Sequence, residues 1–300
     1  MGVIGKRVLF AFWRWAGLAF DATTRAGDSM TLASWFLPIR STVDVRNVLC
    51  AGVIERPMRL GIQLYTLRNV EESLIDTIDR VGSTIFEGVE FAGLGDTDPE
   101  AVAGTLEEAD LDVAAAHVGV DDLSGDVKDI LTTYEILGCR DLVVPSYDRE
   151  AFETRETAQE AGRTLATLAD RLGDEARLHY HNHTFEFPPL STGTAFDAFA
   201  TAATGVGLEI DTGLANHAGV DPVSLIDRYG DRIRLVHLTD SRPGSMDTRH
   251  MDLGTGDVDL AGCVAASADA DVDWLIFEHG LTDDPINSME AAADTLEELT

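Results

Sequence analysis

From residue 58 onward, short runs rich in valine, isoleucine and leucine alternate with longer segments that have helical spacing. Strands that alternate with helices predict a parallel sheet, because each crossover helix returns the chain to the same end of the sheet. Eight such units in about 250 residues match the size of a (β/α)8 barrel, the TIM barrel. The expected strands are residues 59–65, 87–93, 112–118, 141–146, 177–183, 207–212, 233–240 and 274–279.

The competing α/β architecture is a doubly wound open sheet. Such a sheet usually carries a glycine fingerprint directly after its first strand, where the backbone approaches a bound dinucleotide. The segment GIQLYTLR, residues 61–68, contains no such fingerprint. We therefore expect residues 58–300 to form one TIM barrel.

The first 57 residues differ in composition from the rest. They hold seven basic and four acidic residues, which gives this segment a net charge of +3. Residues 58–300 therefore carry a net charge of −34, and the whole chain −31. Their apolar run VLFAFWRWAGLAF is too short to span a bilayer and is interrupted by Arg14. The following AFDATTRAG is a poor cleavage region for a signal peptide. We expect residues 1–57 to be an extension outside the barrel, either loosely attached or produced by the choice of start site.

The charge balance restricts the partners. The chain has 22 basic and 53 acidic residues, and a surface of this kind repels nucleic acid and anionic membranes. The acidic residues are spread through apolar-periodic segments, so they indicate a solvated face and adaptation to high salt, where counterions screen self-repulsion. The three cysteines are far apart and fit neither a disulfide framework nor a zinc motif, which favours a reducing cytoplasm.

Polar residues gather at the ends of the expected strands, where the loops of a TIM barrel carry its chemistry. One such residue alone is usually a hydrogen-bonded loop residue, but many together indicate a site. These residues are Gln63, Glu90, His117, His181, His183, Asp211, His237, Asp240, Glu278 and His279.

The stretch LHYHNHTFEF places His179, His181 and His183 at alternate positions, so their side chains share one face of a strand. If this face is the barrel interior, at least one imidazole reaches the point where Asp211, His237 and Glu278 converge. Such mixed nitrogen and oxygen ligation suits Mn²⁺, Co²⁺, Zn²⁺ or Fe²⁺ better than Ca²⁺. The alternative is that the histidines only hydrogen-bond one another and the loop.

Several segments resemble the xylose isomerase-like TIM barrels, specifically the sugar phosphate isomerase/epimerase group that is related to inosose dehydratases. The resemblance covers about residues 58–297 and rests on RLGIQLYTLR, GVEFAGL, YHNHTFEF, VGLEIDTGLANHAGVDP, RIRLVHLTD, LGTGDVDL and WLIFEHG. It implies one divalent metal ion, most often manganese, with cobalt, zinc, magnesium and iron as alternatives. The ligands that it implies are His181, Asp211, His237 and Glu278.

This chain departs from the pattern at His181, because many members carry a glutamate there and use two glutamates as their acid–base pair. The resemblance therefore implies Glu278 as one catalytic group and His183 or Glu186 as the other. Two loop arginines are candidates for binding a phosphate or carboxylate of the substrate. The residues expected to bind substrate are Gln63, Glu90, His117, Arg242 and Arg249.

These features predict an isomerase or epimerase that acts on a sugar, sugar phosphate or inosose through an enediolate, with a small carbohydrate as its partner. A metal-dependent dehydratase of a keto-inositol or keto-sugar is the alternative reaction. A non-catalytic sugar-binding barrel is an alternative of another class, favoured by the histidine at residue 181. An AP-endonuclease-like hydrolase is least expected, because the chain lacks a basic face for DNA. The sequence also allows a homo-oligomer.

Overall fold

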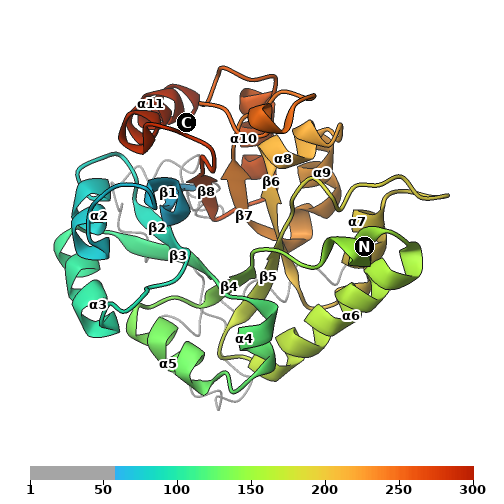
Figure 1. Ribbon diagram of the computed structural model, residues 1–300, viewed down its shortest axis with the longest axis horizontal. Helices are drawn as coiled ribbons and strands as arrows, with labels where there is room; N and C mark the ends of the chain where they lie inside the picture. The colour runs from blue at the N-terminus through green and yellow to red at the C-terminus, as the bar shows by residue number, and fades with distance from the viewer. Residues whose placement is uncertain (1–57) are drawn as a thin grey trace, which may run out of the picture. The chain divides into compact units, whose positions relative to one another are not determined.

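Eight parallel strands close into a barrel in which each strand pairs with the next and β8 pairs with β1 (Figure 1). The computed structural model describes residues 58–300. The strands are β1 (Arg59–Gln63), β2 (Gly88–Phe91), β3 (Asp112–His117), β4 (Asp141–Val144), β5 (Arg177–His181), β6 (Gly207–Asp211), β7 (Ile233–Leu238) and β8 (Trp274–Phe277).

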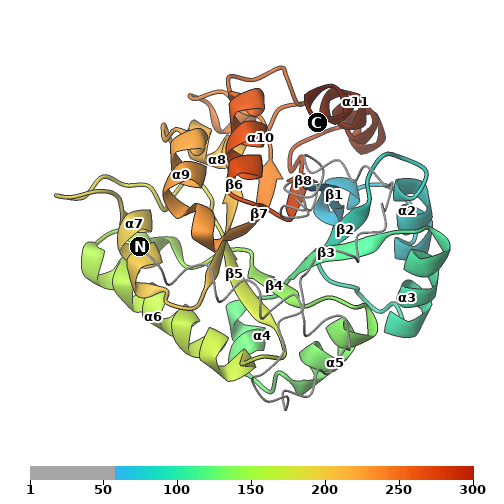
Figure 2. The same cartoon turned by 180° about the vertical axis from the view of Figure 1, so that it is seen from behind.

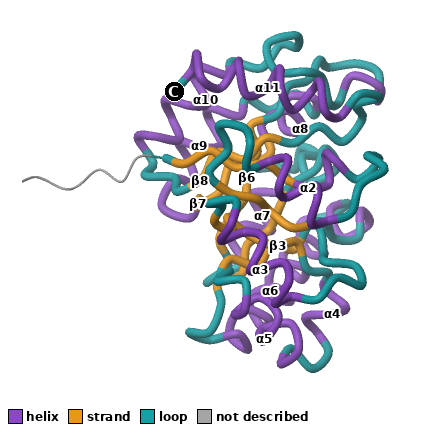
Figure 3. The backbone as a smooth tube through the Cα atoms, turned by 90° about the vertical axis from the view of Figure 1, so that its left-hand side faces the viewer, coloured by secondary structure: helices purple, strands orange, loops and turns teal. Residues whose placement is uncertain are grey.

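Helices lie outside the ring of strands, which is seen from behind in Figure 2 and from the side in Figure 3. The α-helices are α2 (Leu74–Val81), α3 (Pro99–Glu108), α4 (Val120–Ser124), α5 (Lys128–Ile136), α6 (Arg155–Leu172), α7 (Ala195–Ala202), α8 (Thr212–His217), α9 (Pro222–Tyr229), α10 (Leu260–Asp269) and α11 (Pro285–Leu299). The short 3-10 helices are η1 (Leu64–Leu67), η2 (Arg149–Phe152), η3 (Gly230–Arg232) and η4 (Met246–Thr248).

The prediction of a TIM barrel with eight strands is confirmed, but several strands end earlier than expected. The first ends at Gln63, whose side chain accepts a hydrogen bond from the Tyr65 backbone N–H at 2.9 Å and begins η1. The fourth ends before Pro145, which has no N–H to donate to the sheet. The sixth ends at Asp211, which caps α8 through the Leu214 backbone N–H at 2.6 Å.

Helix α6 shows how the outer layer is fixed. Thr154 begins the helix, since its hydroxyl accepts a hydrogen bond from the Thr157 backbone N–H at 3.2 Å and the Thr157 hydroxyl accepts one from the Thr154 N–H. Its buried residues recur every three or four positions and form one apolar stripe that faces inward. They are Ala158, Ala161, Gly162, Leu165, Leu168 and Leu172.

The barrel interior is apolar near the beginnings of the strands and polar near their ends. Trp274, the first residue of β8, fills the lower interior together with Leu235, Ile276 and other small or branched side chains. Gly88 makes room for it, because a Cβ there would lie 2.6 Å from the indole ring. Above this layer the interior side chains are histidines and carboxylates. The buried polar residues are therefore concentrated at the end of the barrel where the strands end.

Within residues 58–300, no helix is long and apolar enough to cross a membrane. The predicted extension, residues 1–57, lies outside the described residues.

Candidate metal centre

Four residues expected to bind a metal ion come together at the ends of four consecutive strands. His181, Asp211, His237 and Glu278 offer ligand atoms that all lie within 4.8 Å of one another. All four side chains are buried. Two imidazoles and two carboxylates in this arrangement match a divalent ion in charge and in ligand chemistry.

Asp211 is held as a metal-binding carboxylate would be. Its Oδ1 accepts hydrogen bonds from the Leu214 backbone N–H and the Thr239 hydroxyl, both at 2.6 Å. Its Oδ2 is buried and has no hydrogen-bond partner among residues 58–300. Burial raises the pKa of Asp211 to about 7. A bound cation would supply the partner that Oδ2 lacks, so the residues present fit a metal ion.

The two histidines expected to bind the ion have carboxylates behind them. His181 Nδ1 lies 3.0 Å from Glu209 Oε2, and His237 Nε2 lies 2.6 Å from Glu90 Oε2. The other nitrogen of His237, Nδ1, lies 3.2 Å from Glu278. Metal-binding histidines usually donate their second ring nitrogen to a carboxylate, which fixes the tautomer and the ring orientation. Glu90 and Glu209 occupy that place here.

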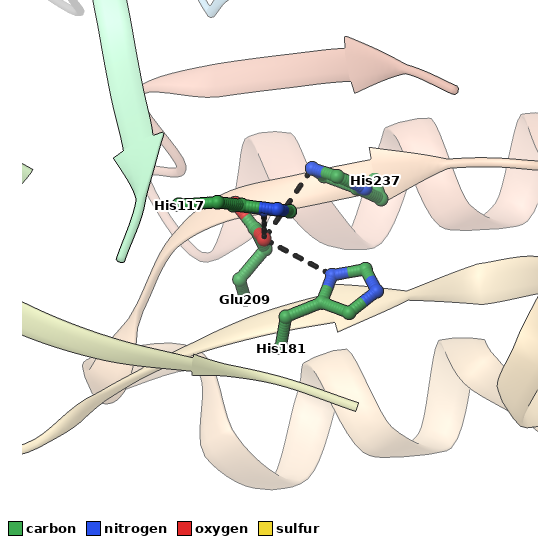
Figure 4. Close-up of side chains that lie close together, drawn as sticks. All are labelled: His117, His181, Glu209 and His237. Atoms are coloured by element: carbon green, nitrogen blue, oxygen red, sulfur yellow. Dashed lines mark hydrogen bonds and ion pairs between the residues drawn. The ribbon is translucent and has the colours of Figure 1, made fainter. Parts of the chain in front are cut away.

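Glu209 lies within the site but was not predicted from the sequence. Figure 4 shows its carboxylate between three imidazoles, with His117 and His237 at 3.4 and 3.3 Å. The available signal was its spacing, because residues two apart on a strand share a face and Glu209 precedes Asp211 by two. Burial raises its pKa, but the surrounding imidazoles outweigh this effect, and the net shift is downward.

His117, His181, Glu209 and His237 form a second set with metal-ligand spacing. The two sets share His181 and His237, and one ring nitrogen cannot serve both sets at once. We assign the ion to the set with Asp211 and Glu278, because that set has two carboxylates to balance a divalent charge and contains the unpartnered Asp211 Oδ2. In this assignment Glu209 orients the ligands.

A cavity of about 410 Å³ opens above the centre. The predicted site residues that line it are His117, His181, His183, Arg249 and Glu278, and Arg149, which was not predicted, lines it as well. Those that do not line it are Gln63, Glu90, Glu186, Asp211, His237 and Arg242.

The predicted substrate-binding residues therefore divide into two groups. Gln63 donates a hydrogen bond to Glu90 at 2.8 Å, so these two side chains support His237 and His117 and do not face the cavity. Arg242 bonds the Thr255 carbonyl at 2.9 Å and pairs with Asp257 at 3.3 Å, away from the cavity. His117 and Arg249 keep access to a ligand.

The two candidate partners of Glu278 differ in their access to the cavity. His183 lines it and exposes 36% of its side chain, and burial lowers the pKa of its ring to about 3. Glu186 is fully buried behind it and accepts a hydrogen bond from the Tyr180 hydroxyl at 2.9 Å. Because Glu186 Oε1 lies 3.9 Å from His183 Nδ1, Glu186 is placed to influence a substrate only through His183.

His179, the first histidine of the series, has a different role. Its Nε2 lies 2.8 Å from Asp141 Oδ1, and the same carboxylate accepts a hydrogen bond from Arg177 Nε at 2.6 Å. Arg177 and Asp141 line a larger hollow at the opposite end of the barrel. Residues at that end of a TIM barrel usually stabilise the fold and do not take part in catalysis. Of the three alternate histidines, His179 thus makes a structural contact, His181 stands at the expected ligand position and His183 lines the cavity.

The fold and the buried centre define the chain as a metal-competent TIM barrel. A model of the family described as xylose isomerase-like TIM barrel matches residues 86–299, and the chain belongs to this family. The predicted resemblance is therefore confirmed.

Individual relatives add detail. The chain is 37% identical over 100 residues to an inosose dehydratase of Lacticaseibacillus casei, which is 29% of this chain and 31% of that protein. It is 26% identical over 254 residues to an inosose dehydratase of Geobacillus kaustophilus, covering 73% of this chain and 81% of the relative. These relatives are enzymes, which supports the prediction that this chain is one.

Solved structures of other proteins share the fold, and two of them illustrate the similarity. A sugar phosphate isomerase/epimerase from Parabacteroides distasonis superposes with a TM-score of 0.67 at 18% identity, covering 80% of this chain and 94% of that one. A probable 3-DHS dehydratase from Bacillus anthracis gives 0.65 at 13% identity, covering 80% and 99%.

Proposed function

We propose that this protein is a divalent-metal-dependent enzyme that removes a proton next to the carbonyl of a polyhydroxy ketone and returns it as an isomerase or epimerase. The observation that carries the proposal is the buried set of His181, Asp211, His237 and Glu278, which lies directly below a cavity. Manganese is the proposed ion, because the two carboxylates suit it and the family resemblance implies it most often. When bound, the ion would act as a Lewis acid toward the carbonyl oxygen of the substrate.

The chain's own residues supply the proton transfer. Glu278 and His183 both line the cavity and can accept a proton, as can His117 and His250, which line it as well. Glu186 lies behind His183, with 3.9 Å between Glu186 Oε1 and His183 Nδ1. We assign Glu278 and His183 as the acid–base pair, with a contribution of roughly 10²–10⁴-fold in rate. His117 lines the same cavity and binds a hydroxyl of the substrate.

A metal-dependent dehydratase of a keto-inositol or keto-sugar is the second candidate. The Geobacillus kaustophilus relative, named an inosose dehydratase, matches 73% of this chain. The site also favours elimination in one respect, because its acid–base pair is a carboxylate and an imidazole. Elimination needs one group that takes the proton and one that protonates the leaving hydroxyl, and a carboxylate and an imidazole can divide these two roles.

Solvent exchange tests the proposal. Manganese-loaded protein in D2O is incubated with ketoses, ketose phosphates and inososes, and deuterium in the C–H bond next to the carbonyl is followed by NMR. We expect exchange with at least one compound, abolished in the Asp211→Asn variant. Exchange with a changed configuration indicates epimerisation, and loss of water indicates dehydration. If no compound exchanges a proton although stoichiometric metal is bound, the proposed function is wrong.

A further inference from the structure

The cavity above the metal centre has an unusual charge for this protein. The chain has 53 acidic residues, yet among residues 58–300 the acidic side chain that lines the cavity is Glu278 alone, and it belongs to the metal centre. Two arginines line the same cavity: Arg149 from η2, after β4, and Arg249 from the loop that follows η4, after β7. The wall of the cavity away from the metal centre is therefore basic in a strongly acidic protein.

Both guanidinium groups are positioned without a carboxylate partner. Arg149 lies 5.3 Å from the centre of the Phe185 ring, and that ring stacks on His183 with 5.5 Å between centroids. Arg249 donates a hydrogen bond to the Met246 carbonyl at 3.1 Å. Neither forms an ion pair with a residue in the described part of the chain. Six other arginines form ion pairs with carboxylates: Arg59, Arg80, Arg177, Arg228, Arg234 and Arg242. Among the arginines of residues 58–300 that form none, Arg149 and Arg249 are distinguished by their place on the cavity wall.

The rim of the cavity also offers apolar surface. Tyr65 and Met246 are the large hydrophobic side chains that residues 58–300 expose most, at 45% and 50%, and both line the cavity. Exposed apolar surface beside a polar centre is typical of a binding site for a small molecule. A ring or carbon chain that presents C–H groups to Tyr65 and Met246 would bury this surface.

We propose that the substrate carries an oxyanion, a carboxylate or a phosphate, which Arg149 and Arg249 bind while its keto group faces Glu278 and His183. This inference rests on the proposed function, because it describes the substrate of the same site. Guanidinium groups match the geometry of both oxyanions and form their strongest hydrogen bonds with them. An uncharged sugar would leave both arginines without a partner of opposite charge.

Paired ligands test the proposal by direct binding to manganese-loaded protein at one fixed salt concentration. Isothermal titration calorimetry compares D-fructose with D-fructose 6-phosphate, and D-tagatose with D-tagaturonate. We expect the charged member of at least one pair to bind about tenfold more tightly, since hydrogen bonds to charged groups are strong. The pair that shows the preference identifies the oxyanion as a phosphate or a carboxylate.

Three variants locate the effect. Arg149→Gln and Arg249→Gln should each reduce the preference for the charged ligand about tenfold or remove it. Arg163→Gln is the matched control, because Arg163 is exposed on α6, outside the cavity, and loses the same charge. The wild-type preference should persist in this control.

The results distinguish a failure of the oxyanion inference from a failure of the proposed function. The inference is overturned if no compound binds, if the charged ligands bind no more tightly than the neutral ones, or if Arg163→Gln reduces the preference as much as the cavity variants do. Proton exchange measured on the same compounds tests the proposed function separately. Exchange with a neutral sugar and no preference for charge would leave the proposed function standing and refute the oxyanion site.

Discussion

Replacing Glu209 with glutamine should weaken metal binding and also lower the stability of the metal-free protein. Glu209 Oε2 lies 3.0 Å from His181 Nδ1 and 3.3 Å from His237 Nε2, and the side chain is fully buried. Its negative charge favours the tautomers in which these nitrogens carry the proton and the opposite nitrogens remain free to bind an ion. Glutamine keeps the volume of the side chain but removes the charge.

The size of the effect follows from this arrangement. Loss of a carboxylate that orients a metal-binding histidine typically lowers metal affinity 10–100-fold, which is about 1.4–2.7 kcal/mol. The fold should respond in the same sense. Burial raises the pKa of Glu209, but the imidazoles of His237 and His117 lower it overall, so the ionised carboxylate stabilises the folded protein. The melting temperature of the chelator-treated variant at pH 7 should therefore fall below that of the wild type.

The assay is a Mn²⁺ titration of chelator-treated wild type, Glu209→Gln and Asp211→Asn, with Glu175→Gln as a control in which an exposed glutamate loses the same charge. We expect Glu209→Gln to bind one ion more weakly, Asp211→Asn to lose stoichiometric binding, and Glu175→Gln to match the wild type. Wild-type affinity in Glu209→Gln would show that this carboxylate does not orient the ligands. Loss of binding in Glu209→Gln with retention in Asp211→Asn would place the ion in the set that contains His117.

Four further outcomes are expected. His237→Ala should lose metal on dialysis against chelator, and stoichiometric metal in it would contradict the ligand assignment. Asp197→Ala should lower the free energy of unfolding in urea at pH 7 by about 1–3 kcal/mol, because Asp197 accepts hydrogen bonds from the Thr194 N–H and the Tyr229 hydroxyl at 2.7 and 2.6 Å. Burial raises the pKa of Asp197, but these hydrogen bonds lower it overall. The contribution of Asp197 to the free energy of unfolding is therefore complete above the unfolded pKa of about 3.9 and is lost as pH falls through the folded pKa. A stability difference between the wild type and Asp197→Ala that stays constant in acid would refute this. A chain that begins at Met58 should fold and bind metal. If it unfolds under conditions in which the full chain is stable, residues 1–57 cover core surface. The melting temperature should rise between 0.1 and 1 M potassium chloride, where the screening length falls from about 10 to about 3 Å, and a flat response would refute adaptation to salt.

The barrel and the convergence of the expected ligands could be predicted because both depend on short periods in the sequence. Each strand has its own apolar run, and the end of a run marks the end of a strand. Asp211, His237 and Glu278 follow such runs directly, so their convergence needed only the rule that parallel strands of a barrel end at one face. The same reasoning with a period of two would have found Glu209.

The direction of loop side chains could not be predicted in this way. Arg242 and Arg249 lie in the same loop and looked equivalent in sequence, but Arg242 turns to Asp257 while Arg249 lines the cavity. Arg149 was not predicted because the sequence around it contains no motif that indicates a binding site. Its position depends on packing against Phe185, which is 36 residues away in the sequence. Contacts between loops depend on tertiary structure, which local patterns do not encode.

The hydrogen bonds around Asp211 have a consequence for the choice of ion. The Thr239 hydroxyl bonds Asp211 Oδ1 at 2.6 Å, and the Thr212 hydroxyl accepts from the Thr239 backbone N–H at 3.0 Å, so β6 and β7 are joined beside the ligands. The spacing of Asp211 and His237 is thus set by the protein before any ion arrives. A preset site with two nitrogen and two oxygen donors accepts several divalent ions of similar radius. The metal found in purified protein should therefore follow the supply in the growth medium, and activity measured with each ion in turn is the better guide to the native one.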